Sequence, residues 1–290
     1  MDASEPNGLC LLNSEQFSSI TEAGKARCSI DVVAIHGMTG NALTTWTHSN
    51  GKLWLRDFLP EALPGIRVFT YGYPSTTIIA AGLDELSGAA DELLHHLTLE
   101  RGKDFTEGST RNYQFRPIVL VCHSVGGFVA KQLVITAVSR IETYSNVHDS
   151  LSAIFFLGTP HRASPKDDFA QILSNVAEIV LDQPYEDNKP TIESLKRLGE
   201  PESATALQSL SRQFKDYMRY VEIISLVEQN TTSPLKRRVV DDVSGTLDAP
   251  RETIVEMEGC NHINLAKFEN ANDPSFKMIV EYLEKIGNAL

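Results

Sequence analysis

Several kinds of chemistry leave no pattern in this sequence of 290 residues. It contains no HExxH pair and no CxxC pair, and its four cysteines lie far apart, so neither a metal centre nor a disulfide framework is indicated. No GxxxxGKS or GxxxxGKT string is present, which argues against a phosphate-binding loop of that type. We therefore expect no metal and no cofactor, and any chemistry must come from side chains.

Positive charge and long apolar runs are also scarce. The formal net charge is -12, whereas a nucleic-acid binder needs a basic face, so we exclude a nucleic-acid partner. No apolar run approaches the roughly 18 residues that cross a bilayer, and we find no secretory leader. Together with cysteines that have no close pair, these absences predict a cytoplasmic protein.

What the chain does contain is an alternation of apolar, β-branched runs with segments of helical spacing. Most of the runs are continuous, as expected of parallel strands covered on both faces. This alternation predicts an α/β fold with a mostly parallel central sheet and helices on both faces. The expected strands are 30–35, 66–71, 118–121, 153–157, 221–227 and 253–257.

The domain organisation follows from the segments that break this alternation. We expect residues 1–27, which are polar and weakly patterned, to be a loosely ordered lead-in to a single domain over 28–290. The stretch of about 161–215 is too long for a plain crossover and is broken by several prolines, so it predicts a helical lid insertion. Near the end, Asp273 and Pro274 predict the start of a closing helix.

The most informative motif is the string CHSVGG at 122–127, directly behind an apolar run. A strand that ends in a serine among small residues and then enters a helix is the nucleophile elbow of α/β-hydrolases. The tight turn favours glycine two positions before and two positions after the serine. Gly126 fits this pattern, whereas the leading position holds Cys122. Ser124 is therefore the candidate nucleophile.

The chain supplies partners for Ser124 in the order that α/β-hydrolases use, with the acid after a later strand and the histidine after the last one. His262 follows the last expected strand and is the candidate general base. Glu228 ends the preceding strand and is the acid that we favour, with Asp241 and Asp242 as alternatives. The acid would hold the imidazole in the correct tautomer.

An oxyanion hole is indicated by the string HGMTG at 36–40, after the first expected strand. Glycines there let the backbone approach a substrate oxygen, so the peptide N–H of Met38, together with that of Val125, would form the hole.

The remaining histidines and one basic run need other interpretations. His161 also follows a strand, but it comes before the acid and so breaks the usual order. His123 should point away from the nucleophile as a structural residue, and His95 and His96 should lie on the surface of a helix. We expect the basic run at 236–238 to be a solvated turn, unless it lies beside the active site and meets an anionic headgroup.

Several strings taken together resemble one group of serine hydrolases, the SesB-like fungal α/β-hydrolases, which are related to the SERAC-type and PGAP-type lipid esterases. The resemblance covers roughly residues 30–285 and is weakest across the expected lid. The strings are HGMTG at 36–40, Trp46-Thr47, WLRDFLP at 54–60, YGY at 71–73, CHSVGG at 122–127 with Lys131-Gln132, and FLGTPH at 156–161.

The resemblance implies a serine esterase or lipase, active on a lipid or phospholipid, with Ser124, Glu228 and His262 as its triad. It implies that Cys122 does not abolish activity, because cysteine also occurs at this place in these proteins. As partners it implies the ester substrate, a membrane surface, and a C-terminal nucleotide-binding domain or self-association. The chain ends just after its closing helix, so we expect either an excised effector domain of a fungal NLR-like protein or a free-standing enzyme. The alternatives are an effector module with little or no turnover, and a peptidase or thioesterase that uses the same triad.

Overall fold

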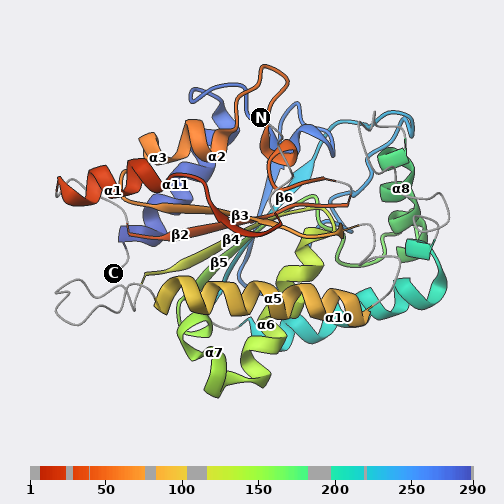
Figure 1. Cartoon of the computed structure of the whole chain (residues 1–290). Helices are drawn as coiled ribbons and strands as arrows, with labels where there is room; N and C mark the ends of the chain where they lie inside the picture. The colour runs from red at the N-terminus through yellow and green to blue at the C-terminus, as the bar shows by residue number, and fades with distance from the viewer. Residues whose placement is uncertain are drawn as a thin grey trace.

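A seven-stranded sheet runs through the middle of the described part of the molecule (Figure 1). The structure, a computed structural model, describes residues 7–23, 29–38, 40–75, 83–102, 116–181, 197–218 and 221–288. The strands are ordered β1-β3-β2-β4-β5-β6-β7, and all neighbours are parallel except β1 and β3. Their bounds are β1 Gly8–Leu11, β2 Asp31–Ile35, β3 Arg67–Gly72, β4 Ile118–His123, β5 Leu151–Leu157, β6 Glu222–Glu228 and β7 Glu252–Met257.

The strands form where the apolar runs predicted them. Every residue of β2 and β3 is buried, because helices cover both faces of the sheet there. All six expected strands are present, with bounds that differ by at most two residues. The parallel sheet with helices on both faces is therefore confirmed.

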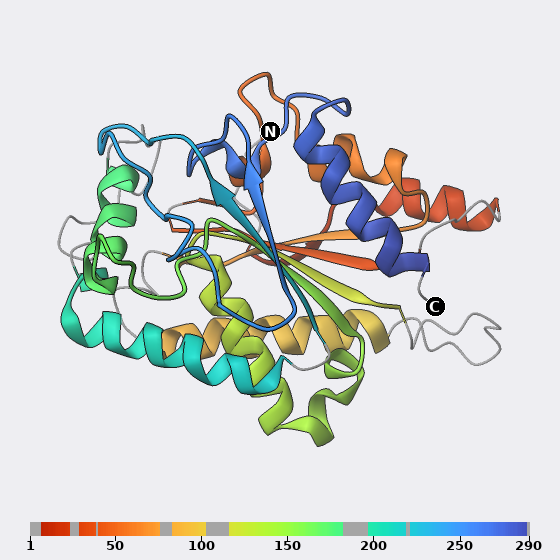
Figure 2. The ribbon, with the colours of Figure 1, turned by 180° about the vertical axis from the view of Figure 1, so that it is seen from behind.

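Two layers of helices enclose the sheet, as the view from behind also shows (Figure 2). One layer holds α5 Leu83–Gly102, α6 Gly126–Ser139, α7 Ile141–His148 and α10 Pro201–Tyr217. Helix α8 Phe169–Leu181 lies at one end of the sheet, at the right of Figure 1, and its apolar residues join the same core cluster. The other layer holds α2 Trp54–Asp57, α3 Leu59–Ala62 and α11 Pro274–Asn288, with the short helices η1 Thr44–Trp46 and η3 Asn264–Ala266. As expected, Asp273 caps α11, because its Oδ1 accepts the N–H of Ser275 at 2.8 Å. Among the helices described, none combines the length and the apolar character that a bilayer span requires.

The expectation of a loosely ordered lead-in over 1–27 was wrong for the part that the structure describes. Residues 8–11 form the edge strand β1, which pairs with β3, and Ser14–Glu22 form α1. Asn13 joins this segment to the sheet, because its side chain donates to Ile66 O and accepts from the N–H of Val68, each at 2.9 Å. Residues 1–6 and 24–28 lie outside the described residues.

The expected lid over about 161–215 divides into parts with different surroundings. Helix α10 packs against α6, and the Lys131 amine donates to the Ser211 hydroxyl across this contact at 2.8 Å. This helix therefore belongs to the layer that covers the sheet and connects β5 to β6, so the lid does not extend over α10. A lid role for α8 stays a prediction, and residues 182–196 lie outside the described residues.

Candidate active site

The nucleophile candidate Ser124 lies at the turn between β4 and α6, where six parallel strands end at the same edge of the sheet. Its φ is +50°, a left-handed conformation that is rare for a residue with a side chain and is found at strained functional turns. A Cβ at Gly126 would overlap the carbonyl oxygens of Ile35 and His36, so this position requires glycine. The turn therefore has the geometry of a nucleophile elbow.

The leading position of the elbow tolerates Cys122 because the thiol side chain packs into the apolar core beneath α6. Cys122 is fully buried, and this burial raises the pKa of its thiol far above the usual value. A thiol held neutral in the core behaves as a small apolar side chain. The mismatch with the glycine pattern therefore leaves the turn intact.

The candidate base His262 reaches Ser124 from the loop after β7. Its Nε2 accepts from the Ser124 hydroxyl with an Oγ–Nε2 distance of 2.9 Å. Both side chains are only 2% exposed. Gly158, at φ +61°, packs against the imidazole, and a Cβ there would lie 3.1 Å from His262 Nδ1. The structure thus brings together two side chains that are 138 residues apart in sequence.

Of the three candidate acids, Glu228 is the one that faces His262. It ends β6, is fully buried, and places Oε2 3.5 Å from His262 Nδ1, while Oε1 accepts the N–H of Val240. The Asp241 carboxylate instead binds the N–H and hydroxyl of Ser244, each at 2.8 Å. The largely exposed Asp242 pairs with Arg238 at 2.6 Å. A carboxylate beside Nδ1 keeps the proton on that nitrogen and leaves Nε2 free to accept.

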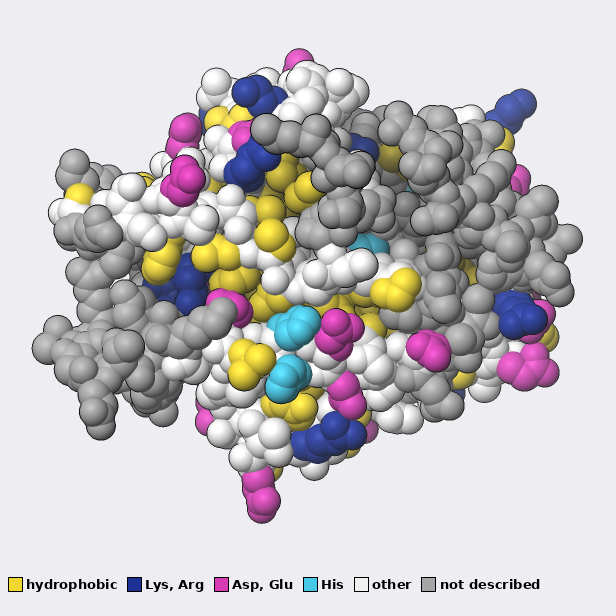
Figure 3. Space-filling model, viewed as in Figure 1, with side chains coloured by type: hydrophobic (Ala, Val, Ile, Leu, Met, Phe, Trp, Pro, Cys, Tyr) yellow, Lys and Arg dark blue, Asp and Glu magenta, His cyan; other side chains and the backbone are white. Residues whose placement is uncertain are grey.

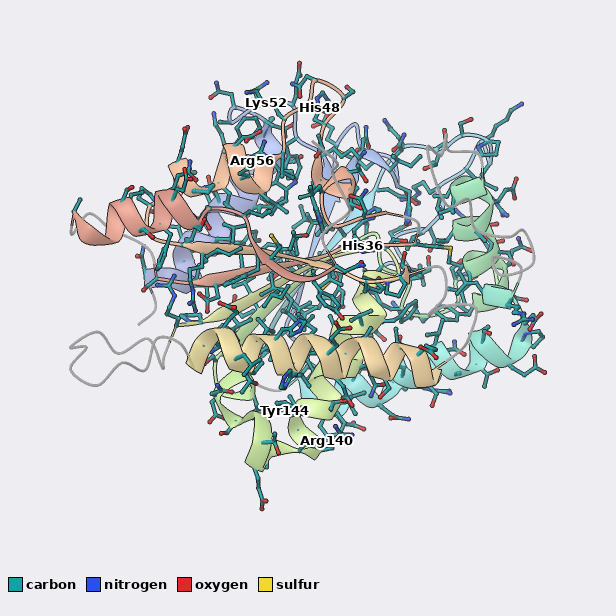
Figure 4. All side chains as sticks on the ribbon, in the orientation of Figure 1. His36, His48, Lys52, Arg56, Arg140 and Tyr144 are labelled. Carbon is teal, nitrogen blue, oxygen red and sulfur yellow. The ribbon has the colours of Figure 1, made fainter. Side chains whose placement is uncertain are left out.

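The loop expected to form the oxyanion hole packs directly against the elbow. A Cβ at Gly37 would lie 3.0 Å from Ser124 Cβ, so glycine permits this close approach. The His36 ring lies between the two helical layers (Figure 4), and its Nδ1–H donates to the Gly37 carbonyl at 2.8 Å. Since C=O and N–H point in opposite directions across a peptide, the Met38 N–H is directed away from His36. Thr39, in the same loop, lies outside the described residues.

The electrostatics of this loop keep His36 neutral. Burial lowers its pKa to about 4, against two hydrogen bonds that raise it. Nε2 of His36 accepts the N–H of Tyr73 at 3.3 Å, and the Tyr73 hydroxyl donates to the His36 carbonyl at 2.7 Å. The neutral imidazole of His36 is therefore held by hydrogen bonds at both of its nitrogens.

The other histidines lie apart from the Ser124 hydroxyl. His161 is buried edge-on against Phe156, with ring centroids 4.8 Å apart. On α5, His95 is exposed and His96 is half-buried. Histidine side chains are visible in cyan on the face drawn in Figure 3. His123 does not simply point away from the site, because its ring contacts the backbone of His262.

The basic run at 236–238 forms ion pairs with neighbouring carboxylates. Arg237 pairs with Asp167 at 3.0 Å and Arg238 with Asp242 at 2.6 Å, so two of its three charges are already matched. Within the described ranges, no three His, Cys, Asp or Glu side chains gather as metal ligands would.

Two residues that the sequence analysis missed hold the reacting side chains by their backbones. The Thr159 hydroxyl donates to the Ser124 carbonyl at 2.7 Å, and the Thr232 hydroxyl accepts the N–H of His262 at 3.1 Å. Thr159 stands in the string FLGTPH at 156–161, but that string gives it no role, and for Thr232 the only signal was its position soon after a strand, which many residues share.

Comparison with known proteins identifies a family and several relatives to which the chain is similar. Residues 96–237 match the family described as the PGAP1-like alpha/beta domain. Protein SERAC1 from Bos taurus is 23% identical over 263 residues, and its counterpart from Homo sapiens is 24% identical over 263 residues. Each match covers 82% of this chain and 36% of the relative, so the chain spans about a third of the length of these curated relatives.

Solved structures share the fold at low sequence identity. A hydrolase from Oleispira antarctica is 12% identical with a TM-score of 0.53, covering 98% of this chain and 96% of that one. A soluble variant of monoglyceride lipase from Saccharomyces cerevisiae, in complex with a substrate analogue, is 11% identical with a TM-score of 0.52 and covers 90% and 88%. The chain therefore has the α/β-hydrolase fold, and its sequence is similar to the PGAP1-like domain and to protein SERAC1.

Proposed function

We propose that this protein is a serine hydrolase that cleaves carboxylic esters, with a lipid or phospholipid as its substrate class. The observation that carries the proposal is the contact of 2.9 Å between Ser124 Oγ and His262 Nε2, with Glu228 behind the imidazole. A hydroxyl hydrogen-bonded to a base that is itself oriented by a carboxylate is the arrangement of an activated nucleophile.

In the proposed reaction, Ser124 Oγ attacks the ester carbonyl carbon while its proton passes to His262 Nε2. The negative oxygen of the tetrahedral intermediate accepts hydrogen bonds from the peptide N–H groups of Met38 and Val125. The C–O bond then breaks, and the alcohol leaves with the proton from His262. Water attacks the acyl-serine next and gives its proton to His262. The bond between the acyl carbon and Ser124 Oγ then breaks, His262 returns the proton to Oγ, and the carboxylic acid is released.

The substrate class rests on the relatives rather than on the triad. A neighbour in fold is a monoglyceride lipase, which favours a lipid ester. A thioester or a peptide could be cleaved by the same three side chains, because substrate class is determined by the pocket. The cysteines described are free thiols, which is consistent with a protein that functions in the reducing cytoplasm.

A second candidate function is that of an effector or signalling domain with little turnover, as in fungal NLR-like proteins. It is favoured by one observation, namely that the SERAC1 relatives are much longer than the matched region. In that case the domain would act within a larger chain.

Labelling of the purified protein with a fluorophosphonate probe tests the nucleophile. We expect wild type to be labelled and Ser124→Ala to be unlabelled, while Ser139→Ala, a serine at the end of α6, is labelled like wild type. A labelled Ser124→Ala would overturn the assignment. A parallel panel of p-nitrophenyl esters, phospholipid vesicles, acyl thioesters and peptides then identifies the class, and activity on none of them would favour the effector function.

A further inference from the structure

His123, the residue before the nucleophile, makes a contact that the proposed reaction does not yet use. Its Nε2 lies 2.8 Å from the backbone oxygen of His262. A carbonyl oxygen can only accept, so Nε2 of His123 must carry the hydrogen and donate it. The nucleophile elbow is thereby joined directly to the loop that carries the base.

The second nitrogen of His123 faces the oxyanion loop. A Cβ at Gly37 would lie 3.1 Å from Nδ1 of His123, so the ring packs against the backbone of that loop. One imidazole thus lies between the base loop on one side and the oxyanion loop on the other. It is attached to the residue next to Ser124, so it fixes all three parts relative to one another.

The base loop depends on such a contact because of where it lies in the sheet. His262 follows β7, an edge strand three positions from β4, which carries Ser124. Several residues of β7 are partly or fully exposed, whereas β4 is almost wholly buried. The backbone of His262 is held at its N–H by Thr232 and at its carbonyl by His123. The second of these bonds is the one that reaches from the elbow.

The charge state of His123 suits this role. Burial and the neighbouring His262, whose ring centroid is 5.4 Å away, lower the pKa of His123 to about 3. The ring therefore remains a neutral donor at any pH at which a histidine base can work. It also places no positive charge beside the imidazolium that forms on His262 during the reaction.

We propose that His123 is a positioning residue that holds the main chain of His262 and thereby sets the distance between its Nε2 and Ser124 Oγ. This inference rests on the proposed function, because it assigns a role within the same triad. It differs from a purely structural role, which would affect the stability of the protein and not the reactivity of Ser124.

The test compares two amides of different reach. In His123→Gln the amide nitrogen can stand near the place of Nε2 and donate to His262, whereas in His123→Asn it stops near the place of Nδ1. We expect His123→Asn to lose about ten- to a hundredfold in fluorophosphonate labelling rate and in kcat, with KM little changed, since small misplacements of reacting groups have effects of this size. His123→Gln should recover most of that loss. His95→Asn, an exposed histidine on α5, should match wild type.

The outcomes distinguish a failure of the role proposed for His123 from a failure of the proposed hydrolase function. Rates are measured well below the melting temperature of every variant and as a function of pH, where we expect the plateau to fall without a shift of its acidic limb. Equal labelling of His123→Asn and wild type would overturn this inference alone. So would equal loss in the Gln and Asn variants. An unlabelled wild type would overturn the proposed function and this inference with it.

Discussion

Buried polar groups lie at both ends of the central strands, but the hydrogen bonds around them differ in length and completeness. At the carboxyl end, Ser124, His262 and Glu228 meet at the edge of the sheet. At the other end, Asp31, the first residue of β2, lies among three arginines from β3, α5 and the segment before β4. The five residues of β2 separate these ends by only about 16 Å.

At the Asp31 end, the carboxylate is fully hydrogen-bonded. Both carboxylate oxygens accept two guanidinium N–H groups each, from Arg67, Arg101 and Arg116, at 2.7–2.9 Å. Burial by itself would raise the pKa of Asp31, but the hydrogen bond and charge of Arg67, with the charges of Arg116 and Arg101, outweigh it and lower the pKa. The Arg67 pair is bidentate, and such pairs are among the strongest polar contacts in proteins.

The Ser124 end includes one contact that is longer than a standard hydrogen bond. The Glu228 Oε2 to His262 Nδ1 distance is 3.5 Å, longer than a standard hydrogen bond, and Ser124 is held at a positive φ. Candidate catalytic groups often tighten only when substrate binds. The comparison suggests that the Asp31 cluster, in which the carboxylate is fully hydrogen-bonded, serves the stability of the fold, whereas the cluster with one long contact keeps a group that can still respond to a substrate.

The largest effect should come from Glu228→Gln, which breaks the catalytic end while keeping its shape. We expect kcat to fall by about 10³–10⁴, because an amide no longer favours the imidazole tautomer that accepts from Ser124. The free energy of unfolding should change by about 1 kcal/mol or less, since the carboxylate of Glu228 already lies beyond hydrogen-bonding distance of the imidazole. Steady-state kinetics and urea unfolding measure the two quantities. Asp242→Asn, at an exposed carboxylate, is the control, and a similar loss in that variant would contradict the assignment of the acid.

Asp31→Asn removes the charge at the other end of the strands, and it should lower the stability of the protein strongly and its reactivity little. Removing the charge leaves three buried guanidinium groups without their carboxylate, so we expect a loss of about 3–5 kcal/mol in the free energy of unfolding. The folded fraction should still react with the fluorophosphonate probe at nearly the wild-type rate. Asp149→Asn, at a largely exposed carboxylate, is the matched control. Normal stability of Asp31→Asn would show that the cluster does not carry the fold.

The same variant separates two pH ranges in which the free energy of unfolding decreases. The pKa of Asp31 is lowered from 3.8, so its stabilisation is complete above pH 3.8 and is lost as the pH falls through the lower folded value. The buried histidines act earlier, because burial lowers the pKa from 6.5 to about 4 in His36 and to about 3 in His123, and also lowers that of His161. The unfolded chain therefore takes up protons first as the pH falls below 6.5. The free energy of unfolding is measured from pH 7 to pH 2.5. In Asp31→Asn we expect the decrease below pH 3.8 that comes from Asp31 to disappear, while the decrease that begins near pH 6.5 stays.

The smallest effect is expected from the neutral hydrogen bond of Thr159 to the Ser124 carbonyl. Thr159→Val keeps the shape and removes the donor, and we expect about 1 kcal/mol less stability, with a labelling rate about tenfold lower. Thr159→Ser keeps the hydroxyl and should stay within about twofold of wild type. If Val and Ser behave alike, the hydroxyl does not help to position Ser124.

The fold and the main site residues could be predicted because their signals are local. Continuous apolar runs predict parallel strands wherever they occur, and the elbow motif singles out Ser124 from six adjacent residues. His262 followed from its place after the last strand. The structure brings both side chains together with Glu228, and their catalytic roles stay predictions.

The remaining features depend on contacts between distant residues. Glu228 is distinguished from Asp241 only by how the loop after β6 folds, since Val240 binds the first and Ser244 the second. Strand β1 has four residues and pairs only at the edge, so its pattern is too short to recognise. The bond from His123 to His262 joins residues 139 apart, and no periodicity reveals such a pair.

The contact of Gly158 with His262 has a consequence for the evolution of such proteins. A side chain at this position would press on the His262 imidazole and on Leu265 while leaving the serine, the acid and the histidine unchanged in the sequence. A lineage could therefore lose hydrolysis through one substitution there and still pass every search for an intact triad. We therefore expect a related chain with a side chain at this place to react more slowly, even where its serine, acid and histidine are all present.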